Sequence, residues 1–172
     1  MKNKILLVSG EPNSINSEII YKTFKKENNK FKKRIYKISN YELIKKQFAL
    51  LKYKEKLIKV KSPFENTKKK GLKIIDINLK FSNPFKVEKK ESSKFVINSL
   101  NYAHKHALNK DVIGLINCPI NKRALHKNEV GVTEYLANNF NIKNFAMLIY
   151  SKNLSVCPIT THLPLKDVHK TI

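Results

Sequence analysis

The residues of this chain that could take part in chemistry are grouped in four short polar segments. Three of these segments follow apolar runs, at residues 9–15, 117–122 and 160–165, and the fourth is residues 131–134. Loops at the carboxyl ends of parallel strands line the ligand-binding edge of an α/β sheet. Residues 131–134 open a predicted helix, whose first backbone N–H groups could hold an anion. These segments are therefore where we expect any catalysis or ligand binding.

His162 is the best candidate for a metal ligand or an acid–base group. It precedes Leu163 and Pro164, and the proline stiffens the loop. A lone loop histidine is also typical of a surface or packing residue, and a metal such as zinc needs three or four ligands. No second histidine lies at a suitable spacing. The remaining histidines are predicted to be surface residues: His104, His106, His126 and His169.

Four other polar residues have both a structural and a functional interpretation. Thr133 and Glu134 are typical of a helix start, and the alternative is a hydroxyl that binds a phosphate or carboxylate together with backbone N–H groups. Lys122 could neutralise an anionic substrate, although lysines are abundant along the whole chain. Glu11 lies in a predicted turn and could orient another group of the site.

Alternating strands and helices would position these segments. Short apolar runs predict strands at residues 4–8, 33–38, 56–60, 72–77, 112–116, 145–150 and 154–159. Helical spacing and capping residues predict helices at about 16–26 (capped by Ser14 or Asn16), 41–51 (capped by Ser39 or Asn40), 88–108, 122–126 and 133–139. The run 112–116 is typical of a parallel strand buried on both faces. The pattern predicts an α/β fold with a mostly parallel sheet flanked by helices.

Length and composition exclude several classes of protein. The chain has 172 residues, of which 41% are hydrophobic and 28% charged, as in folded soluble proteins. No apolar run approaches the roughly 20 residues of a membrane span, and the run 5–8 is too short for a signal peptide. We therefore expect a cytoplasmic protein without a membrane partner. Cys118 and Cys157 fit no metal spacing and have no histidine pattern for catalysis, so both are predicted to be structural, reduced thiols.

The net charge of +22, from 35 basic and 13 acidic residues, raises the question of a polyanionic partner. Only Arg34 and Arg123 are arginines, whereas the reading of bases and phosphates favours arginine. Lys, Asn and Ile are the residues that A/T-rich codons specify, and all three are abundant here. Compositional bias with a solvated lysine surface is thus the favoured interpretation, without a specific nucleic-acid partner, and polyanion binding is the alternative.

The last residues of the chain predict an interrupted element. Residues 160–165 are typical of a strand-to-helix loop, and residues 166–172 of the first turns of a helix. A helix of about two turns is marginal by itself. We therefore expect a longer protein of which residues 1–172 form the N-terminal portion.

Taken together, the polar segments resemble one known family. Residues 10–18 (Gly-Glu-Pro-Asn-Ser-Ile-Asn-Ser-Glu), 118–122 (Cys-Pro-Ile-Asn-Lys), 132–135 (Val-Thr-Glu-Tyr) and 160–168 (Thr-Thr-His-Leu-Pro-Leu-Lys-Asp-Val) occur in the order and approximate spacing of 4-hydroxythreonine-4-phosphate dehydrogenase. That enzyme belongs to the pyridoxal 5′-phosphate pathway. The resemblance spans almost all of this chain but only about the N-terminal half of the family's length.

The resemblance implies a fold like that of isocitrate and isopropylmalate dehydrogenases, and a homodimer. It also implies NAD or NADP, a divalent metal (zinc, magnesium or cobalt) and a small phosphorylated hydroxy-amino-acid substrate. The family reaction oxidises a secondary alcohol to a ketone by hydride transfer, and the resulting β-keto acid then decarboxylates.

Two residues of this chain take family roles by resemblance. His162 matches the first metal-binding histidine, and Thr133 matches the threonine of a substrate-binding Gly-His-Thr-Glu motif, in which Val132 stands where the family has histidine. The segment between Lys122 and Thr133 is a few residues shorter than in the family. The other metal, substrate and cofactor residues of the family lie beyond Ile172, and no catalytic residue is assigned. The resemblance thus implies that the chain alone is inactive. Two alternatives are a non-catalytic basic binding protein on the same scaffold and a dehydrogenase for another phosphorylated hydroxy acid.

Overall fold

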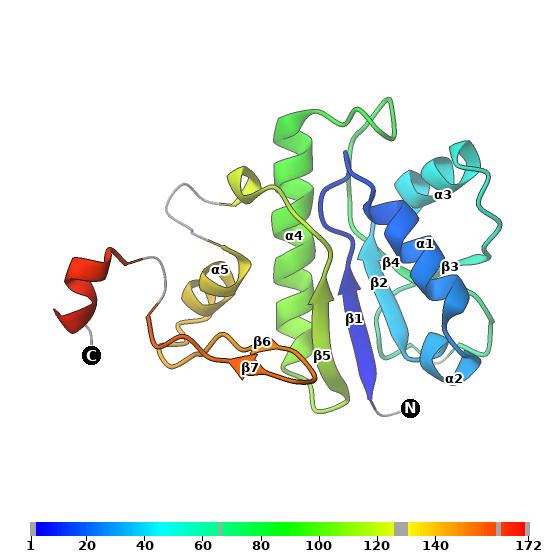
Figure 1. Ribbon diagram of the computed structural model, residues 1–172. Coiled ribbons are helices and arrows are strands. Elements are labelled where there is room, and N and C mark those ends of the chain that lie inside the picture. Colours follow the sequence, from blue (N-terminus) through cyan, green and yellow to red (C-terminus); the bar gives the residue numbers. More distant parts are fainter. Residues whose placement is uncertain (1–2, 66, 126–130, 161–162, 171–172) are drawn as a thin grey trace. The chain divides into compact units, whose positions relative to one another are not determined.

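The computed structural model describes residues 3–65, 67–125, 131–160 and 163–170. The chain divides into two compact units, Met1–Asn128 and Glu129–Ile172. The first unit contains the main sheet, and the second contains short helices and a small hairpin (Figure 1).

A five-stranded parallel sheet forms the centre of the first unit (Figure 1). Its strands are β1 (Lys4–Val8), β2 (Ile35–Ser39), β3 (Leu57–Val60), β4 (Leu72–Asp76) and β5 (Val112–Asn117). They lie in the order β3-β4-β2-β1-β5, and every neighbouring pair is parallel. The chain leaves β1 toward β2 and later returns on the other side of β1 as β5. This reversal creates a topological switch point at the carboxyl ends of β1 and β5. The predicted α/β fold with a parallel sheet is confirmed.

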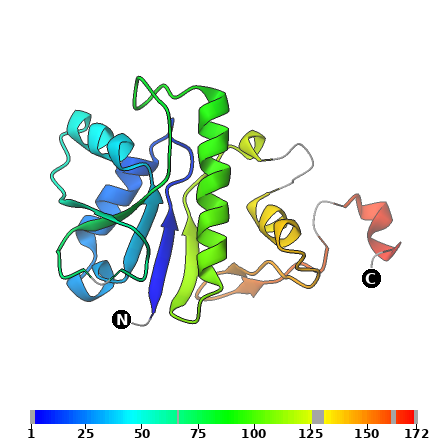
Figure 2. The same ribbon diagram turned by 180° about the vertical axis from the view of Figure 1, so that it is seen from behind.

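Helices cover both faces of this sheet (Figures 1 and 2). They are α1 (Asn16–Lys26), α2 (Asn29–Lys32), α3 (Tyr41–Leu50), α4 (Lys89–Ala107) and the 3-10 turn η1 (Lys122–Ala124). Helices α1 and α3 bury Phe24 and Phe48 against Ile35 and Ile74 on one face. Helix α4 covers the other face and contacts β1, β2 and β5. Within the described ranges, no helix combines the length and apolar character needed to cross a membrane.

One lysine lies inside the apolar layer between the sheet and helices α1 and α3. Lys37 is fully buried on β2, beside Leu7 of β1 and Ile74 of β4 in the strand register. Its Nζ has no hydrogen-bond partner among the described residues and lies 5.7 Å from the centre of the Phe48 ring. Burial lowers the pKa of Lys37 from 10.5 to about 7, and the nearby Cys118 thiol partly opposes this effect. The amine therefore loses its proton near neutral pH.

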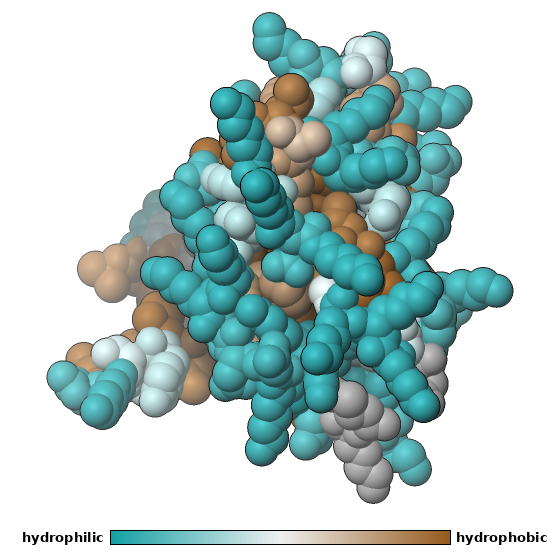
Figure 3. Space-filling model, turned by 90° about the vertical axis from the view of Figure 1, so that its right-hand side faces the viewer, coloured by the Kyte–Doolittle hydropathy of each residue, from teal (hydrophilic) through white to brown (hydrophobic). Residues whose placement is uncertain are grey.

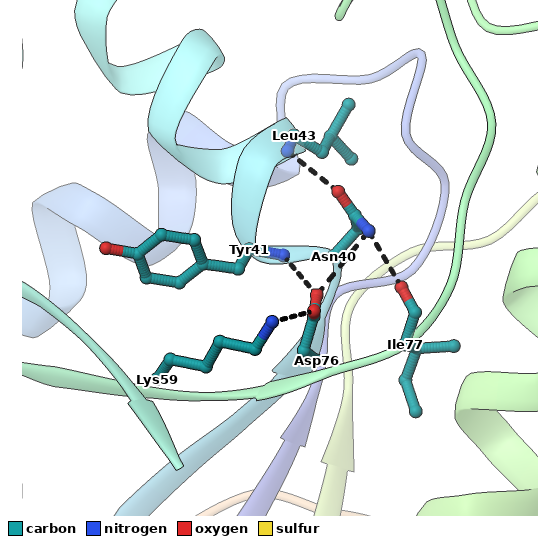
Figure 4. A network of polar contacts seen from close by, with 6 residues as sticks. All are labelled: Asn40, Tyr41, Leu43, Lys59, Asp76 and Ile77. Atoms are coloured by element: carbon teal, nitrogen blue, oxygen red, sulfur yellow. Dashed lines mark hydrogen bonds and ion pairs between the residues drawn. The ribbon is translucent and has the colours of Figure 1, made fainter. Parts of the chain in front are cut away.

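A polar network fixes the start of α3 to the ends of β2 and β4 (Figure 4). Asn40 is the N-cap, and its Oδ1 accepts a hydrogen bond from the Leu43 N–H at 2.9 Å while its Nδ2 donates to the Ile77 carbonyl at 2.9 Å. The Asp76 carboxylate accepts from the Tyr41 N–H at 2.7 Å, where the helix dipole favours a negative charge. The capping residue predicted from the sequence is thus confirmed for Asn40.

We expect Asn40→Ala to lower the free energy of unfolding by about 1–2 kcal/mol, because it removes the helix cap and the bond to the Ile77 carbonyl together. Asn28→Ala is the matched control, since Asn28 caps the four-residue helix α2 at an exposed site and should cost about 0.5 kcal/mol. Urea unfolding of the two variants measures both values. Equal losses of unfolding free energy in the two variants would show that the network around Asp76 gives no stability beyond that of an ordinary helix cap.

Four expectations from the sequence need correction in the first unit. The sequence predicted β5 to be buried on both faces, but Ile113 is 54% and Ile116 51% exposed, because β5 is the outermost strand on its side of the sheet. The N-cap of α1 is Ile15 rather than Ser14 or Asn16, and the Ser14 hydroxyl instead accepts from the Asn16 N–H at 3.2 Å. Helix α2 was not predicted, and the helix expected at 122–126 is the short turn η1 over its described part.

The second unit contains α5 (Val132–Asn139), β6 (Ile149–Tyr150), β7 (Ser155–Val156) and the 3-10 helix η2 (Leu165–Lys170). The strands predicted at 145–150 and 154–159 are two residues long each and form an antiparallel hairpin of their own. Their side chains are exposed, so no apolar contact extends them. The α-helix expected from residue 166 is the 3-10 helix η2.

Candidate functional site

The loops that follow β1 and β5 meet at the switch point of the sheet, because these two strands are neighbours. The Glu11 N–H donates a hydrogen bond to the Pro119 carbonyl at 3.2 Å. The buried Asn16 side chain donates to the Ser9 carbonyl at 3.1 Å and to the Pro119 carbonyl at 2.8 Å. The Pro119 carbonyl and the Asn16 side-chain amide therefore hold segments 9–15 and 117–122 together.

Gly10 allows this close approach. Its φ is +71°, a left-handed backbone conformation that residues other than glycine rarely adopt. A Cβ at this position would lie 2.4 Å from the Pro119 oxygen and 2.9 Å from the Cys118 oxygen. In a dinucleotide-binding sheet, the glycine-rich loop after the first strand leaves room for a phosphate. Here the backbone of Cys118 and Pro119 occupies the space beside Gly10. The loop as described does not fit the pyrophosphate of NAD.

Side chains from distant segments fix the loop after β1. Asn13 forms two hydrogen bonds of 2.8 Å with Val87, one to its carbonyl and one from its N–H. The Glu11 carboxylate accepts from the Ser92 hydroxyl of α4 at 2.5 Å. The Gln47 amide of α3 donates to the Pro12 carbonyl at 3.0 Å. Glu11 therefore joins the loop after β1 to the first turn of α4, and its predicted role of orienting a group of the site stays a prediction.

A cavity of about 220 Å³ lies beside this loop. It is lined by the polar and charged residues Glu11, Asn13, Lys89, Ser92, Ser93, Asn121 and Arg123, together with Val87 and Ala124. Lys89 and Arg123 are exposed, so a small anionic group could meet both cations there. Ser92 and Arg123 could not be predicted as lining residues from the sequence, because each belongs to a segment without a distinctive motif.

The segment 131–134 is the start of α5, which agrees with its structural interpretation. Gly131 is the N-cap, and the Tyr135 N–H donates to its carbonyl at 3.0 Å. The Glu134 carboxylate folds back so closely that a Cβ at Gly131 would lie 2.9 Å from its oxygen. A carboxylate there stabilises the helix start through the helix dipole. Thr133 is the second residue of α5, and its side chain is exposed.

The histidines do not gather into a site in the described part of the chain. His162, the predicted metal ligand, and His126 lie outside the described residues. His169 is exposed, as predicted. His104 and His106 are half-buried rather than fully on the surface, and the His106 ring stacks on Tyr102 with 4.1 Å between ring centres.

The remaining candidates have structural environments. Cys118 is buried, which raises the pKa of its thiol, and Cys157 is exposed; neither forms a disulfide. Lys122 is exposed at the start of η1. Across the described ranges, no three His, Cys, Asp or Glu side chains converge on one point. The described residues therefore do not fit a metal ion.

Comparison with known proteins gives one consistent result. The family model of the pyridoxal phosphate biosynthetic protein PdxA matches residues 30–172. The 4-hydroxythreonine-4-phosphate dehydrogenase of Aquifex aeolicus (strain VF5) is 33% identical over 171 residues, which cover 98% of this chain and 52% of that protein. The enzyme of the same name from Sulfurihydrogenibium sp. (strain YO3AOP1) is 34% identical over 180 residues, with the same coverage.

Solved structures agree. The crystal structure of 4-hydroxythreonine-4-phosphate dehydrogenase from Klebsiella pneumoniae matches with a TM-score of 0.80 at 25% identity and covers 98% of this chain and 54% of that one. The Burkholderia phymatum structure of the same name matches in fold, with a TM-score of 0.84 at 20% identity over 100% of this chain and 54% of that one. The chain thus spans about half the length of the relatives it matches. It belongs to the PdxA family of pyridoxal phosphate biosynthetic proteins.

Proposed function

We propose that this chain forms the N-terminal half of a dehydrogenase that oxidises 4-phosphohydroxy-L-threonine in pyridoxal 5′-phosphate biosynthesis. The observation that carries this proposal is the extent of the match, since 98% of the chain aligns at 33% identity with an enzyme named for that substrate. In the proposed reaction the secondary alcohol loses a hydride to NAD(P)⁺ and a proton, and the β-keto acid formed then loses CO₂.

Within this proposal, Thr133 binds the substrate and His162 is one ligand of a divalent metal (zinc, magnesium or cobalt). A nicotinamide supplies the hydride acceptor that no side chain offers. A single histidine cannot hold the metal, since three protein ligands are the usual minimum for a catalytic site. Complete metal and cofactor sites therefore require residues beyond those of this chain, supplied in a longer polypeptide, by a separate subunit or in a homodimer of the whole enzyme.

We expect the purified 172-residue chain to give no substrate-dependent reduction of NAD or NADP, with magnesium, zinc or cobalt added in turn. The measurement is the rise in NADH or NADPH absorbance after addition of 4-phosphohydroxy-L-threonine. The Aquifex aeolicus enzyme, assayed in parallel, is the positive control. Turnover by the chain alone would contradict the inference that the metal and cofactor sites need residues from outside this chain. It would still support the assigned substrate.

The native protein provides the second arm of this test. Its intact mass and activity would be measured after isolation from its source cells. A mass near twice 20.0 kDa together with activity on this substrate supports the proposal. A native mass of 20.0 kDa, without activity alone or with its co-purifying proteins, would overturn the proposal and favour a binding protein on the same scaffold.

A further inference from the structure

A second cavity, of about 720 Å³, lies in the first unit at the edge of the sheet opposite the switch point. Lys4 begins β1, Tyr36 is the second residue of β2, and Lys73 is the second residue of β4, so the cavity opens at the amino ends of these strands. Its volume falls within the range of about 300–1,000 Å³ that is usual for small-molecule sites. The polar segments singled out from the sequence after β1 and β5 lie at the other edge.

The walls of this cavity carry a large excess of positive charge. Two glutamates, Glu55 and Glu65, face seven lysines: Lys4, Lys32, Lys33, Lys68, Lys69, Lys70 and Lys73. The Glu65 carboxylate is already engaged, since it accepts a hydrogen bond from the Lys61 N–H at 2.6 Å. Figure 3 shows long hydrophilic side chains crowded over the side of the molecule that carries α2 and β3, with hydrophobic surface between them. Lysines at this density repel one another unless an anion lies among them.

Aromatic rings hold three of these ammonium groups in place. The distances from Nζ to the ring centre are 5.0 Å for Lys4 and Phe64, 5.3 Å for Lys32 and Phe24, and 4.4 Å for Lys73 and Tyr36. Lys4 and Lys73 are only 6% and 5% exposed, so they are built into the wall rather than extended into solvent. A cation over a ring face has lost part of its positional freedom, and an anion that binds it has less ordering entropy to overcome.

Lys73, like Lys32, hydrogen-bonds to a backbone carbonyl rather than to a carboxylate. Its Nζ donates to the Lys33 carbonyl, a neutral partner, whereas Lys4 has Asp111 at 3.6 Å. Burial and the charge of Lys33 lower the pKa of Lys73. A negative group in the cavity would stabilise its charged form. The three ring faces are already covered by lysines, so they favour a ligand rich in charge over one that stacks a flat ring.

We propose that this cavity binds a ligand with several linked phosphate groups. Such a ligand carries more charge than a single phosphate and can reach ammonium groups that lie farther apart. The same chemistry occurs in inorganic oligophosphates and in nucleoside triphosphates, and the experiment below distinguishes these two sources.

Isothermal titration of the purified protein with sodium tripolyphosphate, at constant ionic strength, tests the proposal. We expect binding about tenfold tighter than that of orthophosphate, because several charge pairs form together. Lys73→Met should weaken tripolyphosphate binding about tenfold. Lys94→Met removes the same charge from an exposed position on α4 and should change it less than about twofold. ATP in place of tripolyphosphate identifies the source: tighter binding of ATP indicates a nucleotide, and equal or weaker binding indicates the phosphate chain alone.

A second measurement does not depend on a variant. Acylation of lysines, followed by mass spectrometry of the wild-type protein, should show the exposed cavity lysines Lys68, Lys69 and Lys70 protected by tripolyphosphate and Lys94 unprotected. Equal effects of the two variants, or protection of Lys94 equal to that of the cavity lysines, would overturn the proposal in favour of a diffuse lysine surface. Preferential binding of a single-stranded oligonucleotide, lost at moderate salt and insensitive to Lys73→Met, would do the same.

Discussion

Replacing Lys37 with methionine should raise the free energy of unfolding at pH 7 by about 2–4 kcal/mol. The lysine ammonium is solvated in the unfolded chain, where its pKa is 10.5, but it is fully buried in the folded protein, where its pKa is about 7. Each unit of pKa difference corresponds to about 1.4 kcal/mol, so keeping this amine inside the core costs on the order of 4 kcal/mol at pH 7. Methionine has a similar length and no charge, and it fits an apolar layer.

The stability difference between wild type and Lys37→Met should depend on pH. Below pH 7 the folded protein must hold the lysine charged in the core, and the full cost is present. Between pH 7 and 10.5 the unfolded chain binds the proton and the folded protein does not, so stability rises with pH. The advantage of Lys37→Met over wild type should therefore fall by about 3–4 kcal/mol between pH 7 and pH 10, to near zero at pH 10.

Urea unfolding of both proteins at several pH values measures this difference, and titrations common to both cancel. Lys94→Met is the control, since an exposed site should change stability by less than about 0.5 kcal/mol. A Lys37→Met protein less stable than wild type, or a difference that does not change from pH 7 to pH 10, would show that the buried amine is stabilised in the fold.

Sequence patterns predict the elements of this fold better than their environments. The apolar run at residues 4–8 coincides with β1, and Asn40 caps α3 as its residue type indicates. The run at 112–116 predicts a strand equally well, but nothing in it shows whether a neighbour covers Ile113 and Ile116. Lys37 occupies one position of a short apolar strand, where alternation alone would let it face solvent. Its burial follows from β1 and β4 on both sides and from α1 and α3 above, which are all tertiary contacts.

In the candidate site, too, the positions of segments could be predicted from the sequence but the contacts of individual side chains could not. Position after strands β1 and β5 is enough to place segments 9–15 and 117–122 at one edge of the sheet, because parallel strands share one carboxyl edge. Their contact depends on the strand order, in which β1 and β5 are neighbours. Ser92 could not be predicted as the partner of Glu11, since 81 residues separate them and a serine inside a helix has no distinctive pattern. Thr133 and His162 are candidates from their residue types, but their specific roles come only from resemblance to a family and stay predictions.

Gly10→Ala should lower the free energy of unfolding by about 3 kcal/mol or more. A left-handed φ of +71° costs a non-glycine residue about 1–2 kcal/mol, and the added Cβ would lie 2.4 Å from the Pro119 oxygen. That oxygen belongs to backbone and accepts from Glu11 and Asn16, so it cannot move without breaking the contact between the loops after β1 and β5. Amide exchange at Glu11 should rise in the variant, because its N–H loses the carbonyl that protects it.

Two further glycine variants separate strain from overlap. Gly114→Ala on β5 is the control, since an added Cβ there meets no atom within 4 Å, and its effect should stay within about 0.5 kcal/mol. Gly10→Asn removes much of the conformational cost, because asparagine tolerates a left-handed backbone, but it keeps the Cβ. If overlap with Pro119 dominates, Gly10→Asn should be nearly as unstable as Gly10→Ala. Recovery of wild-type stability in Gly10→Asn would place the whole cost in the backbone angle, and the junction of the two loops would then have room for a side chain.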